Sequence, residues 1–251
     1  GVAGVLMALG LTIIFGWLDV IYMAHGEFYA IGAYLAVALL GLGMSFWWAL
    51  ALTPLLMAVL GYATERGLIQ RVFHSKDRHT LTLLLTFGVE VVLEDALKIA
   101  FGANPLRLEA PISGATEMVG LYFPNYRLFV MLFGGALIAA VWLLVFRTSV
   151  GAVVRAAAYD RHMSASLGVP VQRVYAATFA FGVALAGIAG VLLAPIYSVF
   201  PTMGRDFVLI AFSVVIIGGM GSIKGAVLAG LLLTQVQSIS SLYISPVWSD
   251  P

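Results

Sequence analysis

The sequence predicts an all-α membrane protein, a polytopic helical bundle of about eight apolar segments. Of its 251 residues, 62% are hydrophobic and only 10% are charged, and the mean hydropathy is +1.04. Soluble domains carry about 25% charged residues, so one aqueous core could not bury this much apolar surface and lipid must cover much of it. The net charge of +1 gives no indication of nucleic-acid binding, and the absence of cysteine excludes disulfides and cysteine-ligated metals.

The apolar segments have lengths typical of membrane spans, which need about 20 residues within a range of roughly 17–25. The run at 207–220 is short and ends in glycines, so we expect it to be broken or re-entrant, and we expect the junction at 16–26 to be partly re-entrant. We expect residues 1–251 to form a single transmembrane domain and both termini to be truncated relative to the natural protein. The apolar runs lie at about 1–17, 28–44, 46–64, 80–101, 126–146, 174–194, 207–220 and 225–244.

Basic residues predict the sidedness of the connections. Nine of the 13 Lys and Arg residues lie in residues 65–79, in residues 147–173 or at position 224. By the positive-inside tendency, these connections are cytoplasmic, and residues 102–125 and 195–206 are external. Strict alternation of the spans satisfies this assignment.

Residues 147–173 form the longest polar insertion. The spacing of Ala156, Tyr159, Met163 and Leu167 predicts a short amphipathic helix over 152–167, which Gly168 ends. On the cytoplasmic side, such a helix either lies on the bilayer surface or fits a groove on a partner protein. An ordinary connecting helix that touches only lipid headgroups is the alternative.

Several motifs follow one another along the chain in a specific order. They are Ala24-His-Gly-Glu27, the stretch from Gly151-Ala-Val-Val-Arg155 to Ala165-Ser-Leu-Gly168, Gly182 to Gly190, and Gly218-Gly-Met-Gly221. In this order they resemble the permease subunits of branched-chain amino-acid ABC transporters, from about residue 1 to residue 251. The chain is most similar to the LivH-like type, the first of the two permease types that pair in these importers.

The resemblance implies a permease subunit, not an enzyme, that translocates branched-chain amino acids or related small solutes across a bacterial-type inner membrane. It also implies four kinds of partner: membrane lipid, a second related permease, two cytoplasmic ATPase subunits that bind ATP and Mg, and an external solute-binding protein. The chain has no Gly-x-x-x-x-Gly-Lys-Ser/Thr loop, so we expect no cofactor in this chain and no nucleotide site of that kind.

The force of ATP hydrolysis must then enter through a cytoplasmic contact, and the segment around 152–168 is the best candidate. We assign the coupling contact to Arg155, Ala156, Tyr159, Asp160, Ser164 and Gly168.

Ionisable residues interrupt the apolar runs near His25 and Glu27. Such residues inside a membrane usually face a cavity or a partner, so these two either line the solute path or cap the helix that begins near Gly26. We group Tyr34 and Glu90 with them as candidate residues of the translocation path. One His and one Glu are too few ligands for a usual metal site, and no nucleophile accompanies them that would indicate an enzyme.

A charged stripe lies in the run at 80–101. Glu90, Glu94 and Lys98 recur every four residues and share one helical face, on which Glu94 can pair with Lys98. A paired stripe is structural, and we favour that interpretation because a paired carboxylate is a poor proton shuttle. The alternative is a self-contained secondary transporter or channel that uses Glu90, Glu94 and Asp95 as an ion relay.

Small residues recur every four positions in the last third of the chain, at Gly182, Ala186 and Gly190 and again from Gly221 to Ala229. Such ridges let helix backbones approach closely inside lipid. We therefore expect a helix-packing role, with gating as a further role, for Gly182, Gly190, Gly218, Gly219, Gly221 and Gly225.

Overall fold

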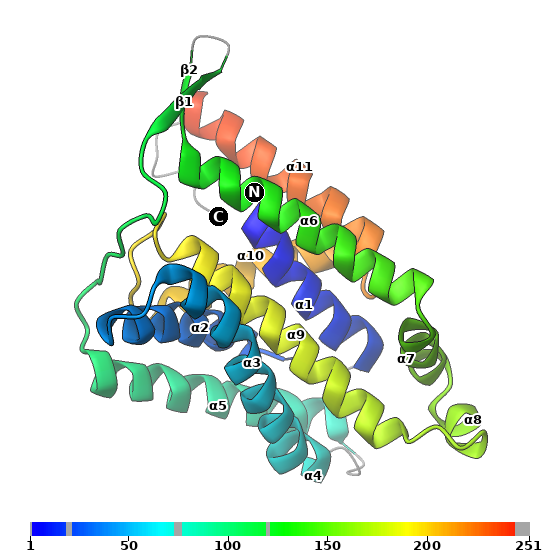
Figure 1. Cartoon of the computed structure of the whole chain (residues 1–251). Coiled ribbons are helices and arrows are strands. Elements are labelled where there is room, and N and C mark those ends of the chain that lie inside the picture. Colours follow the sequence, from blue (N-terminus) through cyan, green and yellow to red (C-terminus); the bar gives the residue numbers. More distant parts are fainter. Residues whose placement is uncertain (1, 19–21, 73–76, 119–120, 244–251) are drawn as a thin grey trace.

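The computed structural model is a bundle of long helices with one two-stranded hairpin (Figure 1). It describes residues 2–18, 22–72, 77–118 and 121–243. Each predicted apolar run corresponds to one long helix, which confirms the predicted fold class. These helices are α1 (Val2–Leu18), α2 (His25–Gly41), α3 (Phe46–Thr64), α5 (Arg78–Phe101), α6 (Asn125–Arg147), α9 (Val171–Leu193), α10 (Met203–Gly218) and α11 (Ile223–Tyr243).

Three helical stretches of the described chain are long and apolar enough to cross a membrane: Phe46–Val72, Asn125–Arg147 and Val171–Leu193. The first of them continues α3 through a π-helical turn, η1 (Glu65–Ile69), into the short α4 (Gln70–Val72). Many large apolar side chains of α3, α5 and α6 are exposed, as expected for helices that face lipid.

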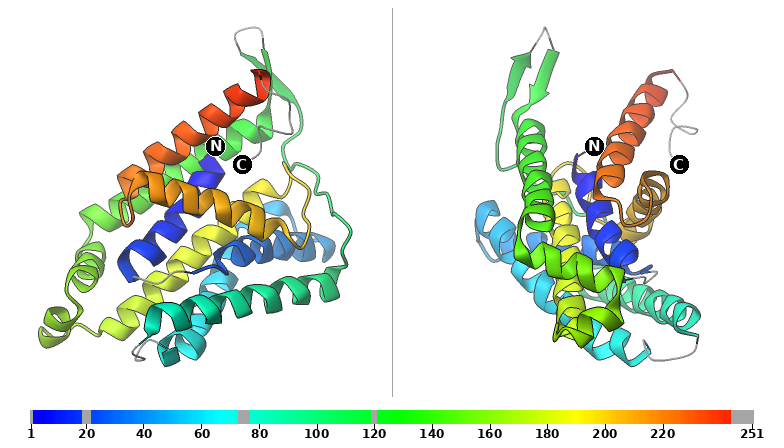
Figure 2. Two further views of the ribbon diagram at one scale, coloured as in Figure 1. Left: turned by 180° about the vertical axis from the view of Figure 1, so that it is seen from behind. Right: turned by 90° about the vertical axis from the view of Figure 1, so that its right-hand side faces the viewer.

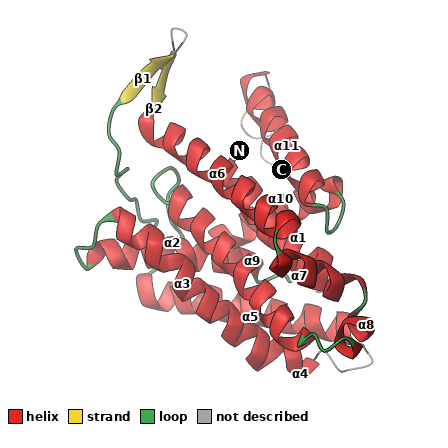
Figure 3. Ribbon diagram, turned by 45° about the vertical axis from the view of Figure 1, so that its right-hand side comes forward, coloured by secondary structure: helices red, strands yellow, loops and turns green. Residues whose placement is uncertain are grey.

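Helix α9 lies at the centre of the bundle, packed against α1, α2 and α3 (Figures 1 and 3). Most of its residues are buried. Glycines allow these close approaches, since Gly182 contacts the backbone of Gly10 on α1, Gly187 contacts Met57 on α3, and Gly190 contacts the backbone of Tyr29 on α2. Backbone-to-backbone contacts of this kind provide much of the packing between helices in a membrane.

The predicted external connections meet at one end of the bundle. Leu106, which follows α5, forms a two-way backbone hydrogen-bonded bridge with Val199, which follows α9, and both N···O distances are 2.8 Å. The same end carries the antiparallel hairpin of β1 (Ala115–Met118) and β2 (Leu121–Pro124), which was not predicted. Figure 2 shows the hairpin projecting beyond α6.

Two of the predicted cytoplasmic connections, those after α3 and after α6, meet at the opposite end. Helices α7 (Ser149–Tyr159) and α8 (Arg161–Ser166) lie there beside the beginning of α9 (Figure 1). Arg66 of η1 and Arg161 of α8 line one pocket, so the connections after α3 and after α6 are neighbours. Lys76, part of the basic connection 65–79, lies outside the described residues.

The prediction of a single helix over 152–167 is wrong, because the chain breaks at Asp160 into α7 and α8. Asp160 has an extended backbone, with φ −143° and ψ 104°, and its carboxylate accepts the backbone N–H of Met163 at 2.8 Å. Asp160 is thus the N-cap of α8. Gly168, with φ +85°, ends the helical path after α8. This left-handed conformation strains residues other than glycine.

Of the two alternatives for 207–220, the broken helix is wrong and the re-entrant helix stays a prediction. Helix α10 is continuous over 16 residues from Met203, which gives a length of about 24 Å. It is shorter than the hydrocarbon core of about 30 Å. The glycines follow the helix and make the turn to α11, with φ of 86° at Gly219 and 79° at Gly221. The junction at 16–26 includes residues outside the described part of the chain.

Replacing Gly190 by alanine should lower the stability of the bundle. The added Cβ would overlap the backbone of Tyr29, and overpacking of this kind costs about 1–3 kcal/mol. The matched control is Gly135→Ala on α6, where a Cβ would meet nothing within 4 Å. Because alanine favours helix by up to about 1 kcal/mol over glycine, the control should be neutral or stabilising. Thermal unfolding in detergent measures both, and equal midpoints for the two variants would contradict the packing described.

Candidate functional site

His25 fixes the beginning of α2 against α1. Its side chain is fully buried, and its Nε2 lies 3.1 Å from the backbone carbonyl oxygen of Met7. A carbonyl oxygen only accepts, so this bond assigns the ring proton to Nε2. His25 therefore links α2 to α1 through a polar contact within the bundle.

Glu27 lies in the first turn of α2, where α2 meets the first turn of α10. Its carboxylate is fully buried, and neither oxygen has a hydrogen-bond partner among the described residues. The backbones of Gly26 and Gly204 touch here, and Oε1 of Glu27 fills the space that a side chain at Gly204 would need. The beginning of a helix favours negative charge, but the described residues form no side-chain cap bond at this end of α2. The capping interpretation of Glu27 is therefore limited to the helix dipole.

Arg205 of α10 neutralises the charged stripe of α5. Its guanidinium lies 2.8 Å from Oε2 of Glu94 and 3.5 Å from Oε1 of Glu90. The predicted pair of Glu94 with Lys98 is also present, at 2.6 Å. The stripe is thus paired both along its own helix and across to α10.

These charged groups form one cluster between α2, α5 and α10. Oε1 of Glu27 lies against Gly204, the residue before Arg205, and Arg205 contacts both Glu90 and Glu94. The structure therefore brings together Glu27 and Glu90, two of the candidate translocation-path residues, from distant parts of the sequence.

Tyr34 lies two turns further along α2 and contacts a different part of α5. Its buried ring is 4.7 Å from the ring of Phe101, measured between centroids, and its hydroxyl has no hydrogen-bond partner in the described part of the chain. The structure thus separates Tyr34 from the cluster that contains Glu27.

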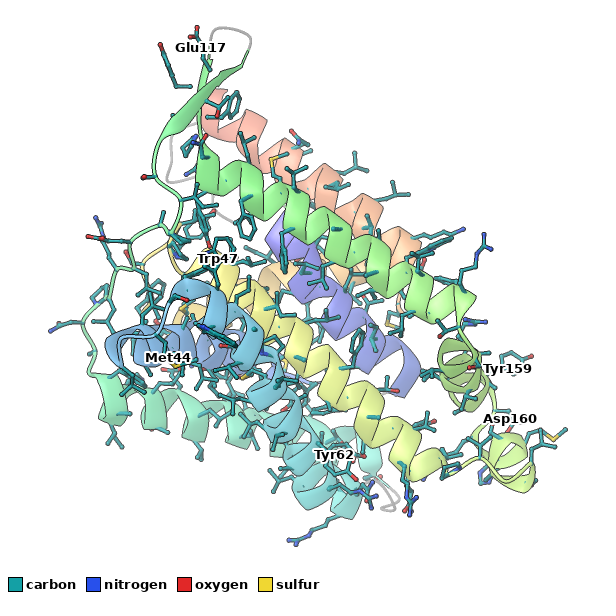
Figure 4. The ribbon with its side chains drawn as sticks, in the orientation of Figure 1. Met44, Trp47, Tyr62, Glu117, Tyr159 and Asp160 are labelled. Atoms are coloured by element: carbon teal, nitrogen blue, oxygen red, sulfur yellow. The ribbon has the colours of Figure 1, made fainter. Side chains whose placement is uncertain are left out.

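The candidate coupling residues lie at the end of the bundle that carries α7 and α8, and they divide into two groups. Tyr159 and Asp160 point outward from the bundle (Figure 4), and Tyr159 is 95% exposed. Ala156 and Gly168 are exposed as well. Arg155 instead holds α7 in place, because its guanidinium donates to the backbone carbonyl of Val145 on α6, and Ser164 is buried.

The glycines at 218–225 bring α10, α11 and α1 together. Gly225 contacts the backbone of Gly218, and Gly221 contacts Gly16 at the end of α1. These are packing contacts, and a gating role for 218–221 stays a prediction. Within the described chain, no group of three or more His, Cys, Asp or Glu side chains could hold a metal ion.

Comparison with known protein families decides the family of the chain. The family described as branched-chain amino acid transport system / permease component matches residues 2–250. The chain belongs to this family. This permease is therefore a multi-pass membrane protein and the transmembrane component of an ABC transport system for branched-chain amino acids, with the ATPase on a separate chain.

Individual proteins similar to this chain are also permeases of branched-chain amino-acid transport systems. The permease LivH of Escherichia coli K12 is 30% identical over 98% of this chain and 84% of its own length. BraD of Pseudomonas aeruginosa is 29% identical over the same shares. LivM of E. coli K12, a permease of the same named transport system as LivH, is 28% identical over 91% of this chain and 59% of its own length. No solved structure gives a significant match.

The family confirms the resemblance to LivH-like permeases and the expected absence of a cofactor in this chain. The alternative of a self-contained ion-coupled transporter gains no support from the structure. Glu94 and Glu90 contact Arg205, and the third carboxylate, Asp95, is 61% exposed and contacts Lys98.

The role of Arg205 was not predicted from the sequence, in which Arg205 is only one residue of the predicted external connection 195–206. One signal could have identified it. An isolated cation at the beginning of an apolar helix, on the same predicted side as two intramembrane carboxylates, is their natural partner.

Replacing Arg205 by glutamine should destabilise the contact between α5 and α10, since Glu90 and Glu94 lose their cross-helix cation. The side chain of Arg205 is 53% exposed, so we expect a cost of about 1–2 kcal/mol rather than the 3–5 kcal/mol of a fully buried pair. Arg127→Gln, on the exposed surface of α6, is the matched control. In denaturant unfolding from detergent, the double variant with Glu94→Gln should recover part of the loss. Strictly additive losses would show that the two side chains do not interact.

Proposed function

We propose that this permease pairs with a second, LivM-like permease and that the two together enclose the pathway of an ATP-driven importer for branched-chain amino acids. Similarity of the chain to both LivH and LivM supports a pair of related subunits. In this assembly two cytoplasmic ATPase subunits supply the energy, and an external solute-binding protein delivers the substrate.

The exposed apolar surface of α7 and α8 carries the proposal that ATPase subunits dock there. Tyr159, Met163 and Leu167 are 95%, 60% and 75% exposed, and they lie at the predicted cytoplasmic end of the bundle. Figure 3 shows α8 at the end of the bundle opposite the hairpin of β1 and β2. Exposed apolar side chains grouped on a rigid, polar-flanked segment are typical of a protein interface.

Hydrogen bonds attach α7 to its neighbouring helices α6 and α9. The guanidinium of Arg155 donates to α6, and the hydroxyl of Tyr175 on α9 donates to the carbonyl of Ala157 on α7 at 3.1 Å. Helix α9 begins at Val171, and only residues 167–170 separate it from α8. A displacement of α8 therefore reaches α9, the helix that contacts α1, α2 and α3.

The cluster around Glu27 supports a role in the solute path. Polar groups among apolar helices are costly and usually face a cavity or a partner in some state of the transport cycle. In our proposal, Glu27 and Glu90 attract the ammonium group of the substrate when the bundle opens, and His25 maintains the position of α2 through Met7.

Replacing Tyr159 by alanine should weaken ATPase docking about tenfold or more while membrane insertion stays normal, because an exposed aromatic residue is a typical interface hot spot. The matched control is Tyr122→Ala, which is 74% exposed at the opposite end. Co-purification of the ATPase subunits and ATP-driven leucine uptake by proteoliposomes measure the effect. Wild-type docking by the Tyr159 variant, or a loss in both variants, would contradict the assignment.

Replacing Asp160 by alanine removes the N-cap of α8 and should cost that helix about 1 kcal/mol. We expect reduced ATP-driven uptake, because the docking surface loses its shape, whereas Asp160→Asn keeps the capping oxygen and should retain uptake. Uptake at the wild-type rate in Asp160→Ala would remove α8 from the coupling contact.

A further inference from the structure

An apolar pocket of about 520 Å³ opens between α1, α6, α7 and α9 at the predicted cytoplasmic end. Apart from Ser149, Thr178 and Arg173, its lining is entirely apolar or glycine. The hydroxyl of Thr178 donates to the carbonyl of Val174 at 2.7 Å, so it offers no donor to a ligand. The pocket therefore suits an aliphatic chain.

A second pocket, of about 460 Å³, shares one lining residue with the first, Arg173. Three arginines from three elements converge on it: Arg66 of η1, Arg161 of α8 and Arg173 of α9. None of the described residues that line either pocket is acidic. This second pocket therefore suits an anion with several oxygen atoms, since guanidinium groups bind phosphate with two parallel hydrogen bonds.

The two pockets together match one amphiphilic ligand. We propose that an anionic phospholipid of the cytoplasmic leaflet binds here, with an acyl chain in the apolar pocket and its phosphate against Arg66, Arg161 and Arg173. Basic pockets between helices on the cytoplasmic side of a membrane are suited to anionic headgroups. An apolar pocket and a cationic pocket that share Arg173 favour a lipid over a soluble anion, because a soluble anion would leave the apolar pocket unused.

The lipid site is distinct from the surface proposed for ATPase docking. Tyr159 and Met163 line neither pocket. A bound acyl chain would instead contact Val150 and Val154 of α7 together with Ala177 of α9. The lipid would thus fill the space between α7 and α9 and brace the two helices against each other.

Native mass spectrometry of the purified chain in detergent tests the proposal, with phosphatidylglycerol and phosphatidylcholine of identical acyl chains as probes. We expect tighter binding of phosphatidylglycerol. Each arginine near an anionic headgroup contributes about fivefold in affinity, so Arg66→Gln/Arg161→Gln/Arg173→Gln should weaken phosphatidylglycerol by well over tenfold. The matched control is Arg71→Gln, an exposed arginine of α4 that lines neither pocket and should bind like the wild type.

A second variant tests the apolar half of the site independently. Ala177→Trp should fill the apolar pocket and weaken the binding of both lipids without changing any charge. It therefore tests the proposal even if the triple variant fails to fold. Equal affinity for the two lipids, or unchanged binding in Ala177→Trp, would overturn the proposal. If inorganic phosphate displaces phosphatidylglycerol from the wild type and Ala177→Trp leaves phosphate binding intact, the site is an anion site and the lipid assignment is wrong. If the lipid is lost from the complex with the second permease, the pocket is a subunit interface instead.

Discussion

Close contact between backbones around α9 is the constraint on which the rest of the bundle depends. Lipid tails are as apolar as the side chains of the helices, so van der Waals packing must hold helices together within a bilayer. Gly182, Gly187 and Gly190 leave room for α1, α3 and α2, respectively. The hydrogen bond between His25 and Met7 requires α1 and α2 both to pack closely on α9. The glycines of α9 therefore determine the geometry of this bond.

Much of the fold could be predicted because the bilayer sets the length of each apolar run and the basic residues mark its ends. The break at Asp160 could not, because an aspartate on a polar helix face looks the same in sequence whether it is exposed or caps a new helix. The pair of Arg205 with Glu94 required knowing that the first turn of α10 comes within side-chain reach of α5, and no local pattern carries that information. The hairpin at 115–124 has strands of four residues, too short for a periodic signal. The candidate site was likewise predicted only in part. The order of the motifs indicated the coupling segment, but not that Arg155 faces inward to Val145.

The proposed docking surface and the cluster around Glu27 lie at different depths, and helix α9 passes near both. Tyr159 and Asp160 belong to a rigid projection at one end, whereas Glu27 and Glu90 lie within the bundle. Helix α9 begins near the projection and passes through the centre of the bundle, so in the proposed mechanism it would connect the two regions.

The pairing of Glu94 has a consequence for how the chain enters the membrane. Chains are synthesised from the amino terminus, so α5 meets the bilayer before α10, and Arg205 with it, has been made. Lys98 is four residues from Glu94 on the same helix and contacts it at 2.6 Å. Helix α5 therefore brings a counter-ion with it during insertion, and the later arrival of Arg205 turns a temporary neutralisation into a permanent link between helices.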